Sequence, residues 1–286
     1  MWHFISEQIG LQLDCDFICS DIRNLPGGYT HQAFKITDGR RRFFVKINQQ
    51  QNIQMFQAEA DGLNHLRIAG LLKIPRVISL GTVSSHSFLV LEYLTLTSGD
   101  HPTWFALGQQ LAKQHRQQTQ NMYGWQSDNY IGATVQVNRW HKHWNFFFAE
   151  QRIGYQLQLL AEKGLKLVNI DVAVEAVKQL LSGHNPVASM LHGDLWQGNV
   201  GFHNHNPVMF DPALYYGDRE TDLAMSELFN CFPNPFYDGY QSIWPLDTQY
   251  QYRKPVYQLY HLLNHALLFG GQYVESAKAL LKNMPH

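Results

Sequence analysis

LHGDLWQGNV, residues 191–200, places an aspartate among apolar residues and an asparagine five positions after it. Gly-Asp and Gly-Asn pairs also occur in surface turns for conformational reasons alone. A phosphoryl-transfer loop needs the same residue types, because a carboxylate must meet the acceptor hydroxyl and an amide oxygen can bind a metal ion. The kinase pattern H-R-D-L-x-x-x-N has the spacing that separates Asp194 from Asn199, with Gly193 here in place of the arginine. The rest of the sequence must distinguish a turn from a catalytic loop.

Length and composition indicate a globular protein. Of the 286 residues, 45% are hydrophobic, enough to bury a substantial core, and the net charge is −1. The basic cluster Arg40–Arg42 lies beside a predicted turn and no longer basic run exists, so we expect no nucleic-acid partner. No apolar run reaches the roughly 18–20 residues that span a bilayer, so we expect no membrane segment.

The cysteines and the first residues bear on the compartment. The chain begins without the basic and apolar regions of a signal peptide. Cys15, Cys19 and Cys231 are an odd and sparse set, so no disulfide framework is expected. Cys15 and Cys19 have no second Cys or His pair at zinc-finger spacing, which argues against a metal site there. We therefore expect a cytoplasmic protein.

The first third of the chain predicts antiparallel strands and one helix. Residues 17–37 hold apolar stretches on either side of Pro26-Gly27-Gly28, and Asp38-Gly39 is a two-residue hairpin signal. The next strand, residues 41–48, alternates two sets of side chains, which places Lys46 on the face opposite Val45. Apolar residues then recur at helical spacing up to Gly70. Two further strands follow at residues 74–83 and 87–94.

The remainder of the chain is mostly helical. We expect helices over residues 105–115, over the aromatic segment 140–164, over 220–229 and over 254–270, with a short strand before Asp211. This order predicts a strand-rich region with one helix, residues 1–93, and a helical region, residues 94–286. The hinge is expected at residues 92–98.

Five residues at these positions have the chemistry that phosphoryl transfer requires. Asp194 is the candidate base, and Asn199 and Asp211 offer the hard oxygen atoms that Mg²⁺ prefers. Lys46 on its strand is the candidate phosphate contact, and Glu59 on the following helix is expected to pair with it.

Each of these residues also has an ordinary interpretation. Lys46 alone is a solvated strand residue, Glu59 a helix-surface residue, and Asp211-Pro212 a turn at the end of a strand. The turn that contains Gly27 and Gly28 lies where a kinase-like fold covers the nucleotide phosphates, but it lacks the full G-x-G-x-x-G pattern and is alone a simple hairpin. The order of the motifs, each on the expected type of element, favours the catalytic interpretation.

The sequence resembles the aminoglycoside and choline kinase branch of the protein-kinase-like fold. Within it, the sequence looks most like the fructosamine kinase (ketosamine kinase) family. The segments that carry the resemblance cover nearly the whole chain: FQAEADGLNHL (56–66), FLVLEYL (88–94), LGQQLAKQHR (107–116), DNYIGATVQVN (128–138), HGDLWQGN (192–199) and DPALYYGDRETDLAMSELF (211–229). The loop containing Trp196 and the GDRETDLA segment are the most specific of these.

The resemblance implies an α+β, bilobal protein-kinase-like fold with an antiparallel sheet in the N-terminal lobe and a mainly helical C-terminal lobe. It implies ATP-dependent phosphorylation of the third sugar carbon of ketosamines such as ribulosamines or fructosamines. By the same resemblance the product is expected to be unstable, so that the amine of a small molecule or a glycated protein is freed. ATP and Mg²⁺ are the implied cofactors. By the same resemblance Asp194 is the base, Asn199 and Asp211 hold Mg²⁺, and Lys46 with Glu59 positions ATP.

The remaining site residues are also implied by the resemblance. The backbone of Glu92, Tyr93 and Leu94 is expected to meet adenine. The candidate substrate contacts are His192, Trp196, Asp218, Glu220, Asp222, Asn129, Tyr130 and Gln136. Each group of them has an alternative role: Trp196 could pack within its loop, the acidic residues could cap the helix near Thr221, and the segment around Asn129 could simply connect helices.

Two other functions remain open from the sequence. The same fold could act on another acceptor of the aminoglycoside, choline or homoserine type. The chain could also be a catalytically inactive ATP-binding module, although the candidate base and metal ligands are all present. The sequence does not indicate an oligomeric state.

Overall fold

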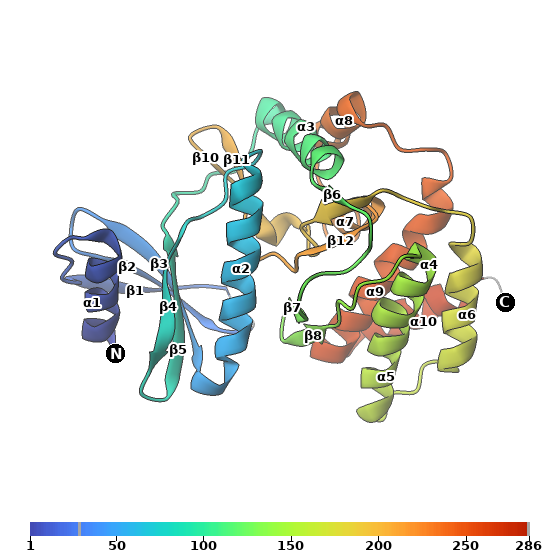
Figure 1. Cartoon of the computed structure of the whole chain (residues 1–286), viewed down its shortest axis with the longest axis horizontal. Helices are drawn as coiled ribbons and strands as arrows, with labels where there is room; N and C mark the ends of the chain where they lie inside the picture. Colours follow the sequence, from blue (N-terminus) through green and yellow to red (C-terminus); the bar gives the residue numbers. More distant parts are fainter. Residues whose placement is uncertain (28–29, 285–286) are drawn as a thin grey trace. The chain divides into compact units, whose positions relative to one another are not determined.

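The computed structural model describes residues 1–27 and 30–284. The chain divides into two compact units (Figure 1). The first comprises Met1–Gly99 and Gly201–Asp211, and the second comprises Asp100–Val200 and Pro212–His286. The functional division expected between residues 93 and 94 stays a prediction.

The first unit is built on an antiparallel sheet with strand order β1-β2-β3-β5-β4. Figure 1 shows helix α1 on one side of this sheet and helix α2 on the other. The core between α1 and the sheet includes Ile5, Ile9, Phe43, Val45 and Ile47. This confirms the predicted alternation of the third strand. The elements are α1 (Trp2–Leu13), β1 (Asp21–Leu25), β2 (Gln32–Thr37), β3 (Arg42–Gln49), the 3₁₀ turn η1 (Gln50–Asn52), α2 (Ile53–Ala69), β4 (Val77–Val83) and β5 (His86–Glu92).

Helix α1 corrects the expectation of a single helix in this region. Its sequence gives a weak signal, because only Ile5, Ser6 and Ile9 are buried and Met1 makes no side-chain capping bond. Helix α2 ends where the sequence predicts, with Gly70 as its C-cap, whose φ of 71° is the left-handed conformation that favours glycine.

The connection between β2 and β3 also differs from expectation. Thr37 pairs with Arg42, so the loop contains four residues and not the two that Asp38-Gly39 predicted. Asp38 Oδ1 accepts hydrogen bonds from the backbone N–H groups of Arg40 (2.8 Å) and Arg41 (2.6 Å). This carboxylate therefore closes a longer turn than the hairpin dipeptide alone requires.

A hairpin from the later part of the chain completes the first unit. It consists of β10 (Val200–His203) and β11 (Asn206–Met209). The backbone N–H of Thr97 donates to the carbonyl of Phe202 (2.8 Å), and that of Met209 donates to the carbonyl of Lys73 (3.1 Å). β11 ends one residue earlier than the predicted strand, and Asp211 follows in the left-handed conformation with φ 56°. The hairpin thus carries Asp211 into the first unit.

The second unit consists of helices around two small sheets. The predicted aromatic helix is present, but Phe147–Gly154 is π-helical. Helix α3 begins at a capping box formed by Asp100 and Thr103. The helices are α3 (His101–Gln117), α4 (Trp144–Phe146), the π-helical segment η2 (Phe147–Gly154), α5 (Tyr155–Glu162), α6 (Ile170–Leu180), α7 (Glu220–Ser226), α8 (Asn234–Ile243), α9 (Tyr250–Phe269) and α10 (Gln272–Lys282).

Short strands hold the loop that follows Leu191. One sheet has the order β12-β9-β6, and β7 pairs with β8 in the other. These elements are β6 (Thr119–Gln120), β7 (Asn129–Ile131), β8 (Thr134–Gln136), β9 (Ala188–Leu191), the 3₁₀ turn η3 (Gln197–Asn199) and β12 (Tyr215–Gly217). Within residues 1–27 and 30–284, no helix has both the length and the apolar character needed to cross a membrane. The three cysteines are free thiols.

Candidate active site

The first candidate group, which we call the Lys46 cluster, comprises Lys46, Glu59 and Asp211. Val45 and Ile47 point into the core beneath α1, so Lys46 between them points to the opposite face, toward α2. Its Nζ lies 2.7 Å from Glu59 Oε1 and donates a hydrogen bond to Asp211 Oδ1. Lys46 is only 2% exposed. A buried ammonium group needs such partners, so the expected pairing of Lys46 with Glu59 is confirmed.

The charges of the Lys46 cluster depend on one another. Burial disfavours the charged form of Lys46, but Asp211 and Glu59 outweigh it and raise the pKa of Lys46. Burial works in the opposite direction on Asp211, yet the Lys46 ammonium prevails and lowers the pKa of Asp211. Burial raises the pKa of Glu59 to about 7, with Lys46 opposing the shift and Asp211 adding to it. Asp211 is therefore an anionic oxygen donor, the kind of ligand that Mg²⁺ takes.

The second candidate group lies in the second unit, in the segment His192–Asn199, which we call the HGD loop. The buried carboxylate of Asp222 accepts hydrogen bonds from the backbone N–H groups of His192 (2.7 Å) and Gly193 (2.8 Å). Gly193 has φ 83°, and a Cβ there would lie 1.9 Å from the carbonyl oxygen of Ala213. Only glycine fits this position, which explains its presence where the kinase pattern has arginine.

Asp222 has a third partner that sequence reasoning did not identify. His115 Nε2 lies 3.1 Å from Asp222 Oδ2, and its Nδ1 lies 2.9 Å from the hydroxyl of Tyr240. Burial raises the pKa of Asp222, but His115 and the other donors more than reverse this, so the pKa of Asp222 is lowered. Its carboxylate thus anchors the HGD loop. This arrangement supports neither predicted role of Asp222 directly, because its oxygens are directed to the protein itself.

Asp194 and Asn199 meet within the HGD loop. Asn199 Nδ2 donates to the carbonyl oxygen of Asp194 (2.8 Å) and to its Oδ2 (3.1 Å). Because the amide nitrogen is used in these bonds, the amide oxygen of Asn199 is the atom suited to bind a cation. Leu195 is fully buried and anchors the loop between them. The short spacing seen in the sequence therefore corresponds to a direct contact.

The residues of the first unit that are expected to contact the nucleotide include Glu92, Tyr93 and the turn that contains Gly27. The carboxylate of Glu92 accepts from Lys73 Nζ (2.9 Å) and from the backbone N–H of Arg76 (3.2 Å), so its side chain has structural partners. The ring of Tyr93 lies 5.3 Å from Lys35 Nζ. Contacts of the Glu92–Leu94 backbone with adenine stay a prediction. Gly27 adopts φ 106° in the turn between β1 and β2, and Gly28 lies outside the described residues.

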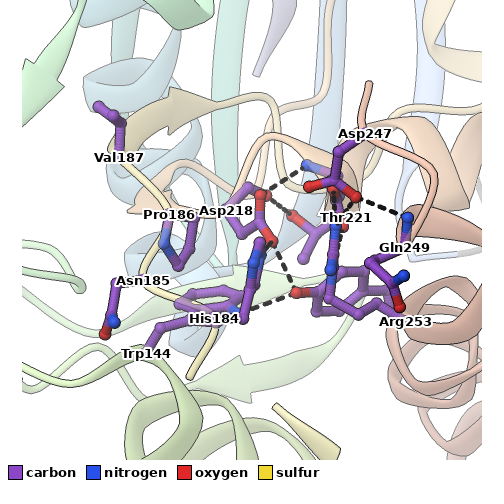
Figure 2. Close-up of polar contacts among 12 residues, drawn as sticks. Trp144, His184, Asn185, Pro186, Val187, Asp218, Thr221, Asp247, Gln249 and Arg253 are labelled. Atoms are coloured by element: carbon purple, nitrogen blue, oxygen red, sulfur yellow. Dashed lines mark hydrogen bonds and ion pairs between the residues drawn. The ribbon is translucent and has the colours of Figure 1, made fainter. Parts of the chain in front are cut away.

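Asp218 lies in a buried polar cluster (Figure 2), and Glu220, two residues later, is also buried. Asp218 Oδ2 lies 2.7 Å from His184 Nε2 and accepts a hydrogen bond from Tyr257 (2.6 Å). Arg253 holds Glu220 through two hydrogen bonds of 2.7 and 2.6 Å. Asp218 Oδ1 also accepts from the backbone N–H of Glu220 (3.1 Å), the first residue of α7, but the N-cap position of this helix is Arg219, which makes no side-chain capping bond. Neither carboxylate is therefore the N-cap of α7, and a substrate role for either of them stays a prediction.

The same cluster has ligand types that could hold a metal ion. One ligand atom each of His184, Asp218 and Glu220 lies within 4.8 Å of the others. The guanidinium of Arg253, however, already neutralises Glu220 and also pairs with Asp247 at 2.8 Å. Figure 2 shows Arg253 and Asp247 side by side in this cluster. The cationic position is therefore filled by the protein.

The remaining predicted substrate contacts divide into two groups. Asn129 and Gln136 are buried, and their side chains donate to the carbonyls of Leu214 (2.7 Å) and Ala213 (3.0 Å). Tyr130 is half-buried on β7. In the HGD loop, His192 is buried and its Nδ1 accepts from the backbone N–H of Asp194 (3.3 Å). Substrate contacts of these residues stay predictions.

Trp196 is half-buried and packs against glycine. A Cβ on Gly198 would lie 2.3 Å from two carbons of the indole ring of Trp196. The ring therefore uses the space that a side chain at position 198 would fill. One face of the ring has this local contact, as the packing alternative predicts, while the residue keeps part of its surface exposed.

Comparisons with known proteins agree with this fold. The fructosamine kinase family model matches residues 1–285. A "Probable ketoamine kinase" of Vibrio parahaemolyticus is 46% identical over 99% of both chains. One of Synechocystis is 45% identical over 98% of this chain and 96% of its own. The crystal structure of a "Putative fructosamine-3-kinase" from Haemophilus somnus has a TM-score of 0.96 and 37% identity, covering 100% of this chain and 98% of its own.

A more distant structure shows the breadth of the fold. A thermostable mutant of an aminoglycoside phosphotransferase, solved with AMP-PNP and hygromycin B, has a TM-score of 0.67 at 15% identity and covers 99% of this chain and 98% of its own. The protein is thus an ATP-dependent phosphotransferase with a protein-kinase-like fold. Within that class, the chain belongs to the fructosamine kinase family.

Proposed function

We propose that this protein phosphorylates the hydroxyl on the third sugar carbon of ketosamines and so promotes their deglycation. The observation that carries the proposal is the HGD loop, where Asp222 fixes the backbone and Asn199 contacts Asp194. The matching family and the ketoamine kinase relatives support this class of acceptor. Free ribulosamines and fructosamines are the first substrates to test, and amines on glycated proteins are the second.

Asp194 accepts the proton of the acceptor hydroxyl in this proposal, as the aspartate of a kinase catalytic loop does. Lys46 contacts the α- and β-phosphates of ATP, held in place by its ion pair with Glu59. Asp211 and Asn199 are the residues that would hold Mg²⁺, and a carboxylate with a lowered pKa and an amide oxygen suit this ion. Bound there, Mg²⁺ would neutralise charge on the phosphates.

Trp196 is the proposed acceptor contact. Trp196 lies two residues after the proposed base in the same loop, and Gly198 lies against one side of its ring. Aromatic rings contact the apolar faces of sugars and attract ammonium groups, and a ketosamine carries both.

A cytoplasmic location is proposed on the sequence features alone.

An ADP-release assay tests the acceptor class. Wild-type protein with Mg²⁺ and ATP is mixed with ribulosamines, fructosamines, an aminoglycoside, choline or homoserine. We expect the highest kcat/KM with a ketosamine, since the acceptor for which a site is built has the highest value. Turnover that is confined to the other acceptors would overturn the proposal, and so would no turnover with any of them.

Asp194→Asn tests the assignment of the base. We expect kcat to fall by about 10²–10⁴-fold with ATP affinity retained, because a general base contributes that much and acts on the acceptor. Asp238→Asn, at an exposed position of α8, is the matched control and should leave kcat unchanged. Equal activity of Asp194→Asn and Asp238→Asn would show that Asp194 is not the base.

A further inference from the structure

Arg152 is a buried cation whose partners are neutral. It lies in the π-helical segment η2 and is 0% exposed. Its guanidinium donates to the carbonyl of Val137 (2.5 Å) and to Asn138 Oδ1 (2.7 Å). Its Cζ lies 4.1 Å from the ring centroid of Tyr215, and the rings of Phe147 and Tyr260 lie at 4.7 and 5.6 Å. Aromatic faces thus provide much of the compensation for its charge.

Such an arrangement is costly for the fold, which calls for an explanation. A buried charge is disfavoured unless it is paired and fully hydrogen-bonded, and Arg152 Nε has no hydrogen-bond partner in the part of the chain that the structure describes. π-Helical segments are also rare and occur frequently at functional sites. Both features lie on the same eight-residue segment, Phe147–Gly154. These two features indicate that the segment has a role beyond packing.

The guanidinium fixes a buried group of three amide side chains, which we call the amide cluster: Asn129, Gln136 and Asn138. Asn138, held by Arg152, donates through Nδ2 to Asn129 Oδ1 (2.9 Å). Gln136 Nε2 donates to the same oxygen (2.8 Å). The hydroxyl of Tyr260 donates to Gln136 Oε1 (2.7 Å). All three amides are at most 6% exposed, so water is largely excluded from these bonds.

The amide cluster supports the backbone next to the HGD loop. Asn129 Nδ2 donates to the carbonyl of Leu214 (2.7 Å), and Gln136 Nε2 donates to that of Ala213 (3.0 Å). The backbone N–H of Ala213 in turn donates to the carbonyl of His192 (2.9 Å), and the Ala213 carbonyl lies against Gly193. The connection from the amide cluster to Asp194 therefore passes through only two residues. The first is Ala213, and the second is His192 or Gly193 of the HGD loop.

The charges of Asp194 and Arg152 also reach this network. Burial raises the pKa of Tyr260, with the negative charge of Asp194 adding to the shift and Arg152 opposing it. Asp194 and Arg152 thus both act on the hydroxyl that is bonded to Gln136.

We propose that Arg152 is a positioning residue for phosphotransfer, whose guanidinium orders the amide cluster and thereby fixes the 213–214 segment beneath the HGD loop. The inference rests on the proposed function for its kinetic consequence only. Arginine suits this role because its planar fork bonds Val137 and Asn138 simultaneously, which the point charge of a lysine does not reproduce. Small displacements of a catalytic group reduce the rate strongly, so a residue outside the site can control kcat.

The test compares Arg152→Gln and Arg152→Lys with Val177→Ala, a cavity variant in α6, which packs on η2. Activity is expressed per folded molecule. We expect kcat of Arg152→Gln to fall by about 10–100-fold with KM for ATP within about twofold, and Arg152→Lys to recover part of the loss. Val177→Ala should lose stability and keep its kcat. A loss in Arg152→Gln no larger than that in Val177→Ala would overturn the proposal.

A second measurement is independent of the acceptor. Hydrogen exchange followed by mass spectrometry should show faster exchange in residues 190–195 and 211–216 of Arg152→Gln, but not of Val177→Ala. Unchanged exchange in these residues would refute the positioning role. Absence of ketosamine turnover would refute only the proposed function. If neither Arg152 variant folds, Tyr260→Phe keeps the ring and removes one hydrogen bond; unchanged kcat and exchange in that variant would overturn the inference.

Discussion

Replacing Asp222 by asparagine should weaken the anchor of the HGD loop while keeping the size of the side chain. Oδ2 of Asp222 accepts from the His192 N–H and lies within reach of His115 Nε2, while Oδ1 accepts from the Gly193 N–H. An amide has one oxygen, so its NH₂ group must face at least one of these donors. The best orientation keeps the oxygen at the position of Oδ2 and leaves the N–H of Gly193 without an acceptor.

The magnitude follows from these contacts. One buried donor left unpaired costs about 1–3 kcal/mol, and the two remaining bonds each lose about 1 kcal/mol when their acceptor becomes neutral. We therefore expect Asp222→Asn to lower the free energy of unfolding by about 3–5 kcal/mol, a large part of the 5–15 kcal/mol typical of a whole protein. Urea denaturation at pH 7 measures this value.

The kinetic consequence separates anchoring from general stability. Folded Asp222→Asn should show a kcat reduced at least tenfold, because the backbone that carries Asp194 is no longer fixed. The exposed Asp238→Asn variant is the control for the same chemical change. A change in unfolding free energy below about 0.5 kcal/mol, together with normal kcat, would refute the reasoning, since the buried carboxylate would then not be needed by its three partners.

Three further predictions concern other residues. Burial lowers the pKa of His261 to about 3, so the unfolded chain binds a proton near pH 6.5 that the native protein does not bind. Acidification from pH 7 to 5 should therefore lower the free energy of unfolding by about 2 kcal/mol. His261→Leu should remove that part of the pH dependence in urea denaturation, and an unchanged dependence would contradict the assignment. Gly198→Ala should displace the Trp196 ring and raise KM for a ketosamine about 2–10-fold at constant KM for ATP; steady-state kinetics with an unchanged acceptor KM would show that the ring does not bind it. Lys46→Met should lower the unfolding free energy by about 1–3 kcal/mol because the half-buried carboxylates of Glu59 and Asp211 lose their buried cation, and a loss below about 0.5 kcal/mol in urea would argue against mutual compensation.

The parts of the fold that were predictable are those with local or periodic signals. Alternation along residues 41–48 gave the correct face for Lys46, because one face of that strand fills an apolar core. The spacing of Asp194 and Asn199 corresponded to a real contact, since a short loop brings residues five apart together. Helix α1 was not predicted, because few of its residues are buried and its apolar pattern is therefore weak. A local hydrogen-bond pattern also explains the loop between β2 and β3. The Asp38 carboxylate accepts from backbone N–H groups in this loop and so favours a longer turn over a two-residue hairpin.

The roles of Asp218, Glu220 and Asp222 could not be read from the sequence, because their partners are far away along the chain. Three carboxylates close together after a metal-binding motif are consistent with substrate recognition, yet each is directed to the protein: Asp222 to the HGD loop, and Glu220 to Arg253, 33 residues away. A carboxylate buried this deeply is stable only with donors around it, and those donors are then unavailable to a ligand unless the ligand displaces them. Recognition of the acceptor by these side chains would therefore require breaking an existing buried pair, whereas recognition by Trp196 would not, which makes the aromatic ring the better first target for mutagenesis of acceptor specificity.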